Sequence, residues 1–428
     1  ASPVVWVTTE LGRTYLFTGF PWVLLGYSQT PVLPIAQISS VFGVYGVSAL
    51  VAAVSAALAF GATEPGAAHA GHDSRHPDSR LSDSAMSGFS RSRRAWTPLA
   101  ATFVVIVGIA IWGSVRVGRA ELTRTGEAMR VGLIQGNIDQ PDKWEAARAA
   151  TIFRDYLSMT RQAIGAGAQL IIWPESSLPY RFEDDPAVAD RVRNLARQAR
   201  VPILFGSDQV EWRTQNNQRV PIRYFNSAFL VSPDGSTGGV YRKMHLVPFG
   251  EYVPLKRIFF FAAPLVEAVS DFSAGDDAVL LPVNGHPIST AICYEIVYPG
   301  LVRRFVQGGS ELLTTITNDA WFGRTSAPYQ HFEQASMRAI EEGRYLVRAA
   351  NTGISGIVDP YGRVLAVTGI FQPAVTVGDI RFLRTLTVYA RIGDVFAYAS
   401  AVLTLLLLAL PRRRRYLVAA SPHVARRL

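Results

Sequence analysis

The sequence predicts an α/β domain joined to membrane-spanning α-helices. Of its 428 residues, 49% are hydrophobic and 18% are charged, and this charged fraction is below the roughly 25% usual for globular domains. Long apolar runs occur towards both ends of the chain, and between them short β-rich runs alternate with amphipathic helical patterns. Part of the chain therefore belongs in lipid, and the part between is expected to fold as an α/β domain.

Three apolar runs are long enough to cross a hydrocarbon core of about 30 Å, at a rise of about 1.5 Å per residue. An earlier apolar stretch, at 6–27, is interrupted by Gly19-Phe20-Pro21-Trp22 and predicts a broken or interfacial helix. These patterns divide the chain into the following parts: a membrane region at 1–60 with one span at 34–60, a flexible cytoplasmic linker at 61–96, a transmembrane helix at 97–118, an extracytoplasmic α/β domain at 121–384, a transmembrane helix at 388–410, and a basic cytoplasmic tail at 411–428.

The formal net charge of +9 would suit either nucleic acid or an anionic membrane surface. Arginines cluster at 91–94 and 412–415, and each cluster adjoins an apolar run. This placement favours membrane orientation, so we expect no nucleic-acid partner. If both clusters are cytoplasmic, the domain between the last two spans lies on the extracytoplasmic side.

Within that domain the periodicity predicts six strands, three helices and one hairpin. The expected strands are 131–138, 170–173, 202–206, 225–231, 288–293 and 312–317. The expected helices are 144–166, 186–198 and 329–349. The hairpin pairs 353–358 with 363–367 through the turn Asp359-Pro360-Tyr361-Gly362.

Three ionisable residues stand at strand ends in apolar surroundings. They are Glu175, Lys243 and Cys293, and Cys293 is the only cysteine, which excludes an internal disulfide framework. Sites in open α/β sheets collect at the carboxyl ends of strands, so these three side chains could converge.

Together these residue types cover what acyl transfer through a thioester requires. A thiol must lose its proton to attack an ester, a nearby lysine is expected to lower the thiol pKa, and a carboxylate can serve as the general base. The lysine ammonium and the backbone N–H of Tyr294 could then stabilise the oxyanion.

Five sequence blocks accompany these residues along the chain. They are Gln135-Gly136-Asn137-Ile138 followed by Lys143-Trp144; Trp173-Pro174-Glu175-Ser176; the block 241–255, which contains Lys243 and Glu251; Cys293-Tyr294-Glu295; and Asn318-Asp319-Ala320-Trp321-Phe322-Gly323. With these blocks the chain resembles the apolipoprotein N-acyltransferase family, the membrane branch of the nitrilase (carbon–nitrogen hydrolase) superfamily. The resemblance extends upstream to the blocks at 16–22 and 26–29.

The resemblance implies a four-layer αββα nitrilase-like sandwich on a transmembrane α-helical bundle. It implies a multi-pass protein of the inner (cytoplasmic) membrane that needs no metal or other cofactor. The implied reaction transfers an acyl chain from a membrane phospholipid, through a thioester on Cys293, to the N-terminal α-amino group of a diacylglyceryl-cysteine apolipoprotein. We expect a monomer. The family would have about eight spans, so we also expect that N-terminal sequence is missing here.

Residue by residue, the resemblance makes Glu175 the general base, Lys243 the oxyanion stabiliser and Cys293 the nucleophile. The positions that match substrate-binding residues of the family are Trp144, Asn226, Glu251, Tyr294 and Glu295.

Each assignment has a structural alternative. Cys293 could be an inert buried strand residue, Glu175 a carboxylate favoured by a helix N-terminus, and Lys243 part of a solvated basic patch. Glu251 could be a turn residue, and Tyr294-Glu295 could support the nucleophile turn without contacting substrate.

Two other features are open at this stage. His69, His72 and His76 have a spacing that could suit a metal, but solvated linker residues explain them better. The apolar segment at 259–266 follows a polar block, and we interpret it as a mobile lid that touches the bilayer.

Two other functions would fit part of the pattern. A membrane-tethered amidase or nitrilase would use water in place of the amine, and a catalytically silent scaffold would only bind acylated partners. The apolar spans disfavour the first, and the presence of glutamate, lysine and cysteine together disfavours the second.

Overall fold

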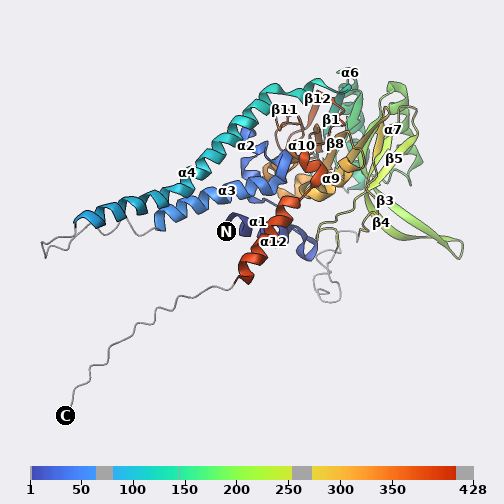
Figure 1. Cartoon of the computed structure of the whole chain (residues 1–428). Coiled ribbons are helices and arrows are strands. Elements are labelled where there is room, and N and C mark those ends of the chain that lie inside the picture. The colour runs from blue at the N-terminus through green and yellow to red at the C-terminus, as the bar shows by residue number, and fades with distance from the viewer. Residues whose placement is uncertain (1, 64–80, 144, 253–271, 411–428) are drawn as a thin grey trace, which may run out of the picture.

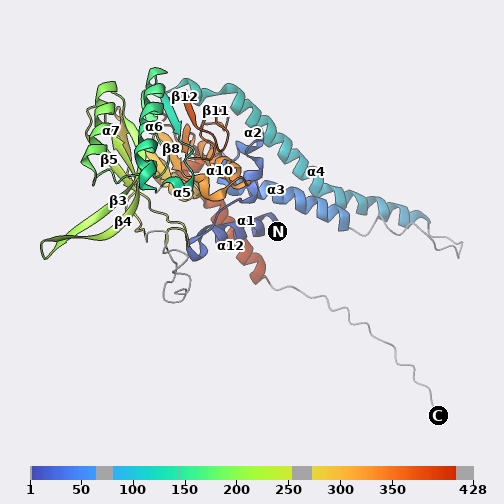
Figure 2. The same cartoon turned by 180° about the vertical axis from the view of Figure 1, so that it is seen from behind.

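The structure, a computed structural model, describes residues 2–63, 81–143, 145–252 and 272–410 (Figures 1 and 2). Two six-stranded sheets form the centre of the α/β domain. The first sheet has the order β12-β1-β2-β3-β4-β5, with β12 Ala374–Arg381, β1 Ala128–Gln135, β2 Leu170–Ile172, β3 Ile203–Gln215, β4 Gln218–Val231 and β5 Thr237–Arg242. The second has the order β11-β10-β9-β8-β7-β6, with β11 Val364–Val367, β10 Gly356–Val358, β9 Leu346–Ala350, β8 Leu312–Thr317, β7 His286–Ile292 and β6 Leu281–Val283.

Helices cover the outer face of each sheet. Helices α6 (Ala146–Gly165) and α7 (Pro186–Ala199) lie on the first sheet, and α9 (Pro299–Gln307) and α10 (Ala327–Glu342) lie on the second. Short helical segments connect the layers: η3 Glu121–Arg124, α5 Gln140–Lys143, η5 Cys293–Val297 and η6 Asp319–Phe322. The order of layers is therefore helices, sheet, sheet, helices.

Strand β2 is apolar on both faces because both of its faces are covered. In β2, Leu170 and Ile172 face the core between the two sheets, whereas Ile171 faces the helical layer. Alternate residues of a strand point to opposite faces, so a doubly covered strand is continuously apolar. This explains why the short apolar run at 170–173 is recognisable in the sequence.

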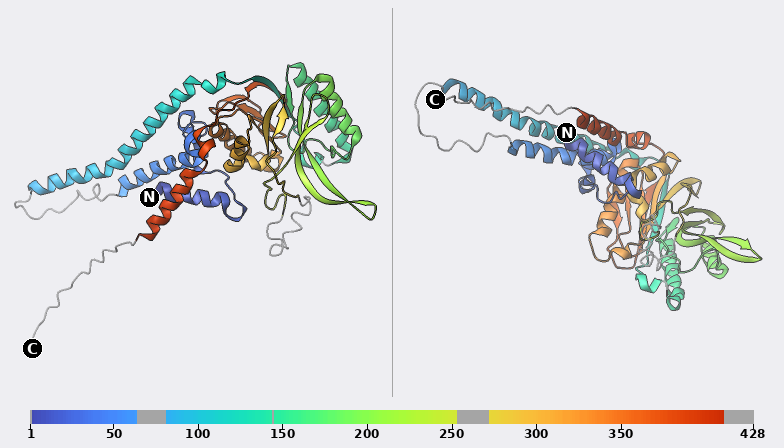
Figure 3. Two further views of the ribbon diagram at one scale, coloured as in Figure 1. Left: turned by 45° about the vertical axis from the view of Figure 1, so that its right-hand side comes forward. Right: turned by 90° about the horizontal axis from the view of Figure 1, so that it is seen from below.

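The apolar segments near the two ends of the chain pack beside one another. The helices are α1 Ser2–Tyr15, α2 Leu33–Ala36, α3 Ser39–Thr63, α4 Leu81–Arg119, α11 Val388–Ile392 and α12 Val395–Ala409, with η1 Leu16–Thr18 and η2 Leu25–Gln29. Helices α3 and α4 lie side by side and extend away from the sandwich, and α12 lies beside α1 (Figures 1 and 3). Among the described residues, the stretches 39–62 and 96–124 are long and apolar enough to cross a membrane.

Two membrane-region predictions differ from the structure. Residues 81–96, expected in a flexible linker, form the start of α4; none of residues 81–95 is a proline, so the backbone ladder continues upstream of the apolar run. The expected span at 388–410 is divided, because α11 ends at Ile392, where Gly393 follows with a φ of 66°, and α12 begins after Asp394. At about 1.5 Å per residue, α12 is shorter than a typical hydrocarbon core.

Most of the helices and strands predicted in the α/β domain are present, but several begin or end at other residues than expected. Helix α10 ends at Glu342 and not at 349, because Gly343 adopts a left-handed C-terminal conformation with a φ of 62°. The residues after it form β9, a fully buried strand between two neighbours. The hairpin of β10 and β11 is confirmed as an antiparallel pair. Strands β3 and β4 are longer than expected and project from the sandwich (Figure 3).

Several hydrogen bonds join the membrane region to the sandwich, and one of them forms at a break in α3. Helix α3 is broken at Gly43, whose φ is 66° and whose position leaves no room for a Cβ beside Tyr389. The Val44 N–H, freed at this break, donates to Oε1 of Glu341 on α10 at 2.7 Å. The sandwich thus supplies a hydrogen-bond acceptor to the interrupted membrane-region helix.

Candidate active site

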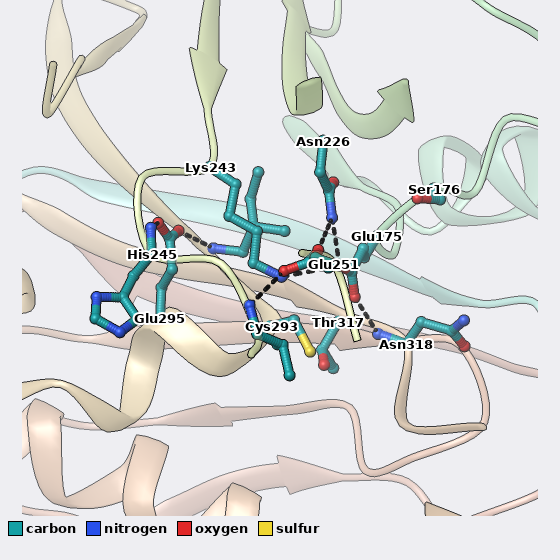
Figure 4. A network of polar contacts seen from close by, with 12 residues as sticks. Glu175, Ser176, Asn226, Lys243, His245, Glu251, Cys293, Glu295, Thr317 and Asn318 are labelled. Carbon is teal, nitrogen blue, oxygen red and sulfur yellow. Dashed lines mark hydrogen bonds and ion pairs between the residues drawn. The ribbon is translucent and has the colours of Figure 1, made fainter. Parts of the chain in front are cut away.

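The three side chains predicted to be catalytic come together where their strands end (Figure 4). Glu175 follows β2, Lys243 follows β5 and Cys293 follows β7. The two sheets face each other, so strands from both deliver side chains to one edge of the sandwich. Nζ of Lys243 lies 3.5 Å from Oε1 of Glu175, and both charged groups interact electrostatically with the Cys293 thiol.

Lys243 is an ammonium held between two carboxylates. Its side chain is 1% exposed, and its Nζ donates to Oε1 of Glu251 at 2.8 Å. Burial by itself lowers the pKa of Lys243, but Glu251 and then Glu175 outweigh it and raise the pKa above its usual range. Lys243 therefore stays charged and can face a developing negative charge.

Glu175 is held in one orientation by two donors. Its Oε1 accepts from Nδ2 of Asn226 at 2.7 Å, and its Oε2 accepts from the backbone N–H of Asn318 at 2.8 Å. The same Nδ2 of Asn226 donates to Glu251 at 3.1 Å. Asn226 and Glu251, expected at substrate-binding positions, thus lie directly against Glu175 and Lys243 and orient them.

The nucleophile candidate occupies a sharp turn. Cys293 has a φ of 54° and begins η5 directly after β7. A side chain in this left-handed region is strained and needs its surroundings to hold it. Cys293 keeps some exposed surface, although protein surrounds most of the thiol.

The electrostatics of the thiol differ from the expectation. Burial and the Glu175 carboxylate raise the pKa of Cys293 to about 12, while Lys243 and a hydrogen bond with Thr317 act in the opposite direction. The expected lowering of the thiol pKa by Lys243 is present, but burial and the Glu175 carboxylate have the larger effect and disfavour the thiolate. The resting sulfur is a thiol, and its proton must leave as attack occurs.

We expect this raised pKa to be visible in alkylation kinetics. The thiolate is the reactive form, so its fraction and the rate of alkylation by iodoacetamide should rise about tenfold per pH unit between pH 7 and 9.5. An ordinary thiol would level off near about pH 8.5. Intact-mass spectrometry reads a single site, since the chain has one cysteine.

Glu175→Gln is the matched control for this measurement. Removing the carboxylate removes one cause of the raised pKa, so alkylation at pH 7 should become faster. Acylation, which needs the base, should become about 10²- to 10⁴-fold slower. A plateau below pH 9 in the wild type would contradict the assignment of a protonated thiol.

Glu295 is buried and holds the turn at Cys293 and the end of β5 together. Its side chain is fully buried, and its carboxylate accepts hydrogen bonds from the nucleophile turn, the β5 end and a neighbouring tyrosine. The donors are Tyr241 OH at 2.8 Å, Met244 N at 2.7 Å and His245 N at 3.0 Å to Oε1, and Ile292 N at 2.8 Å to Oε2. Burial raises the pKa of Glu295 to about 7, and these hydrogen bonds lower it in part. The geometry favours support of the turn over substrate contact.

Tyr294 lies in an aromatic cluster that includes the membrane region. Its ring is 5.9 Å from that of Phe20, 6.4 Å from that of Trp22 and 5.2 Å from that of Tyr298. The side chain thus packs the nucleophile turn against the segment after α1, while its backbone N–H belongs to the turn itself.

Sequence reasoning missed a second buried lysine at the site. Lys143 Nζ donates to the backbone oxygen of Glu175 at 3.2 Å, and burial lowers the pKa of Lys143 to about 8. Nearby Asp208 is also buried, and this raises the pKa of Asp208 to about 6. The block Lys143-Trp144 was a signal for this position, but only its tryptophan was singled out.

Some predicted features fall outside the described residues: Trp144, the segment at 259–266, the histidines of the linker and the arginines at 412–415. Within the described part of the chain, no cluster of three or more histidine, cysteine, aspartate or glutamate side chains could hold a metal ion.

A cavity of about 480 Å³ adjoins the site. It lies between the end of α1 with η1 and the start of α9, and it reaches the residues that follow Lys243. Its lining includes Tyr15, Thr18, His245, Tyr298 and Arg304.

Comparison with known proteins finds family matches for the membrane region and for the α/β domain. The sequence profile of the carbon-nitrogen hydrolase family matches residues 130–386, and that of the apolipoprotein N-acyltransferase N-terminal domain matches residues 1–57. The apolipoprotein N-acyltransferase of Geobacter metallireducens is 38% identical over 96% of this chain and 74% of its own length. That of Methylococcus capsulatus is 35% identical over 92% of this chain and 70% of its own length.

The chain belongs to the apolipoprotein N-acyltransferase family. It is an acyltransferase with a carbon–nitrogen hydrolase domain, and the resemblance found in its motifs is confirmed. An amidase from Nesterenkonia sp. is 21% identical, with a TM-score of 0.47, over 64% of this chain and 97% of its own. The amidase alternative is not favoured, because the match at residues 1–57 is to a domain of the acyltransferases.

Proposed function

We propose the route by which this enzyme performs lipoprotein N-acylation, with a membrane phospholipid as the acyl donor. In the first half-reaction the Cys293 sulfur attacks the carbonyl carbon of a phospholipid ester while Glu175 takes the thiol proton. The oxyanion is stabilised by the Lys243 ammonium and the Tyr294 N–H. The C–O bond then breaks, Glu175 returns the proton to the departing alkoxide, and a thioester and a lysophospholipid result.

In the second half-reaction the free α-amino group of a diacylglyceryl-cysteine apolipoprotein attacks the thioester carbonyl. Glu175 takes a proton from the amine, and the C–S bond breaks to give the amide. The released sulfur regains its proton, which restores the resting thiol. A shared covalent intermediate predicts ping-pong kinetics.

The observation that carries this proposal is the placement of a carboxylate, an ammonium and a thiol from three strand ends at one edge of the sandwich. The protonated thiol fits concerted removal of the proton by Glu175, since no thiolate has to be stored. The adjoining cavity, with exposed Arg304 in its lining, offers room for a substrate that carries a phosphate.

We further propose that the enzyme is a monomeric, multi-pass protein of the inner membrane with its α/β domain on the extracytoplasmic side. The apolar stretches at 39–62 and 96–124 and the arginines at 91–94 support this arrangement. Both substrates are lipids, and an enzyme seated in the bilayer can reach them without extracting them.

Mass spectrometry of the purified full chain with phospholipid vesicles tests the donor. We expect an added mass of one acyl chain on Cys293 and release of lysophospholipid when no acceptor is present. Adding a diacylglyceryl lipopeptide with a free amino group should remove the adduct and acylate the peptide. A peptide with a blocked amino group is the control, and an adduct that disappears equally with it would indicate hydrolysis and contradict the acceptor assignment.

A further inference from the structure

The backbone carbonyl of Cys293 has a buried partner that the reaction as written does not use. Nε2 of His331, on α10, lies 3.2 Å from the carbonyl oxygen of Cys293. The His331 side chain is fully buried. The contact reaches from the helical layer to the turn that carries the nucleophile.

His331 is held in place by a buried ion pair. Its Nδ1 lies 3.0 Å from Oδ1 of Asp319, and Nη2 of Arg348 lies 2.8 Å from Oδ2 of Asp319. The same Nη2 is 3.1 Å from Nδ1 of His331, and the Thr317 hydroxyl donates to Oδ1 of Asp319 at 2.9 Å. The side chains of His331, Asp319 and Arg348 are all fully buried, so the imidazole ring has no freedom to turn away.

Nε2 of His331 faces a carbonyl oxygen, which can only accept, so a hydrogen bond between them requires the proton on Nε2. Two forms of the ring meet this requirement: the charged ring, whose Nδ1–H donates to Asp319, and the neutral ring with its proton on Nε2, whose Nδ1 accepts from Arg348. Burial of His331, and after it the charge of Arg348, lower its pKa, which favours the neutral form, and in that form the contacts with the Cys293 carbonyl and with Arg348 both require the proton on Nε2. The Cys293 carbonyl therefore accepts a hydrogen bond from His331.

Anchoring that carbonyl also orients the next amide. Among the described residues there is no cis peptide bond, and in a trans peptide the C=O and the following N–H point in opposite directions. The N–H of Tyr294 shares its peptide plane with the Cys293 carbonyl, so it points away from His331. Tyr294 is the second residue of η5, where amides have no acceptor within the helix. This is the N–H that the proposed function assigns to the oxyanion.

We propose that His331, held by Asp319 and Arg348, is a positioning residue that aims the oxyanion-binding N–H of Tyr294 by binding the carbonyl oxygen of Cys293. The inference rests on the proposed function. The positive φ of Cys293 makes such an anchor necessary, because this strained conformation persists only where its surroundings hold it.

A residue of the membrane region, Trp22, packs against both His331 and Tyr294. The Trp22 ring lies 5.2 Å from that of His331 and 6.4 Å from that of Tyr294. Its Nε1 donates to Oε1 of Gln330, the neighbour of His331, at 2.9 Å. Trp22 thus packs against both the anchor and the residue whose amide is aimed.

A matched pair of variants of the full chain in detergent micelles tests the proposal. His331→Gln places an amide donor about where Nε2 lies, whereas His331→Asn places it about where Nδ1 lies, too far from the Cys293 carbonyl. Two reactions of Cys293 are compared: acylation by a p-nitrophenyl ester, which passes through an oxyanion, and alkylation by iodoacetamide, which does not.

We expect His331→Asn to acylate about 10²- to 10³-fold more slowly than the wild type, the effect of losing one oxyanion donor. His331→Gln should recover at least about tenfold of that loss, and alkylation should stay within about threefold in both variants. Equal losses in the two reactions, or equal acylation by the two variants, would overturn the proposal. Thermal unfolding shows whether each variant is folded. If one variant is not folded, the ratio of the acylation rate to the alkylation rate in the other variant is compared with the same ratio in the wild type, and an unchanged ratio overturns the proposal. A wild type that the ester does not label at Cys293 would instead contradict the proposed function.

Discussion

Replacing Cys293 with serine is expected to abolish formation of the acyl-enzyme and to lower N-acylation of a diacylglyceryl lipopeptide by at least about 10⁴-fold. A hydroxyl is a much weaker nucleophile than sulfur at neutral pH and needs a stronger base. Glu175 is placed for a thiol whose pKa is about 12, and loss of a nucleophile typically costs this much or more. Intact-mass spectrometry after incubation with phospholipid, together with peptide acylation, measures both effects.

The Cys293→Ser variant should remain folded, because one small polar side chain replaces another at a partly exposed position. Its thermal unfolding midpoint should therefore stay close to that of the wild type. Residual activity above about one per cent in a folded variant would show that the sulfur does not carry the acyl chain. The mechanism with a thioester intermediate would then be wrong.

Replacing Lys243 with methionine is expected to lower both the stability and the activity. Lys243 lies 2.8 Å from Glu251 and 3.5 Å from Glu175, and its side chain is 1% exposed. Removing one partner of a buried ion pair typically costs about 3–5 kcal/mol, because the remaining charge is left uncompensated. Acylation should also fall by about 10²-fold or more, since the oxyanion loses a donor. Chemical unfolding and acylation by phospholipid give the two measurements.

The loss of stability in Lys243→Met should depend on pH. Without the ammonium, Glu175 and Glu251 repel each other when both are charged, and protonation of one carboxylate removes this repulsion. A carboxyl whose pKa is raised by folding stabilises the folded state when protonated, and this contribution is lost as the pH rises through the folded pKa. The variant should therefore lose less stability, measured as the difference in the free energy of unfolding between wild type and variant, at pH 5 than at pH 8.

A double variant separates the two effects. Lys243→Met combined with Glu251→Gln leaves one buried carboxylate, so much of the stability should return while acylation stays low. A single Lys243→Met variant as stable as the wild type at pH 8 would contradict the ion-pair argument. Recovery of acylation in the double variant would show that Lys243 acts only by neutralising Glu251.

Much of the α/β domain could be predicted from local pattern. Strands at 170–173 and 312–317, helix α7 and the hairpin of β10 and β11 carry strong periodicity or turn signals. The extended hairpin of β3 and β4 had a signal that was overlooked, since Asn216 and Asn217 both have positive φ at its turn. Strand β9 had no comparable signal. It follows α10 in the sequence after only three residues, and it is buried on both faces, so its residues do not alternate between apolar and polar in a way that separates them from the helix.

The sequence by itself determined the residue types of the site and their order, because Glu175, Lys243 and Cys293 each stand in a recognisable block. It also determined which parts of the chain are apolar enough for lipid. Only the tertiary structure decided that Asn226 bridges two carboxylates, that Glu295 is a buried acceptor and that His331 touches the nucleophile turn. These contacts join residues far apart along the chain, and electrostatic effects such as the raised pKa of Cys293 depend on burial and distance, which local sequence patterns do not contain.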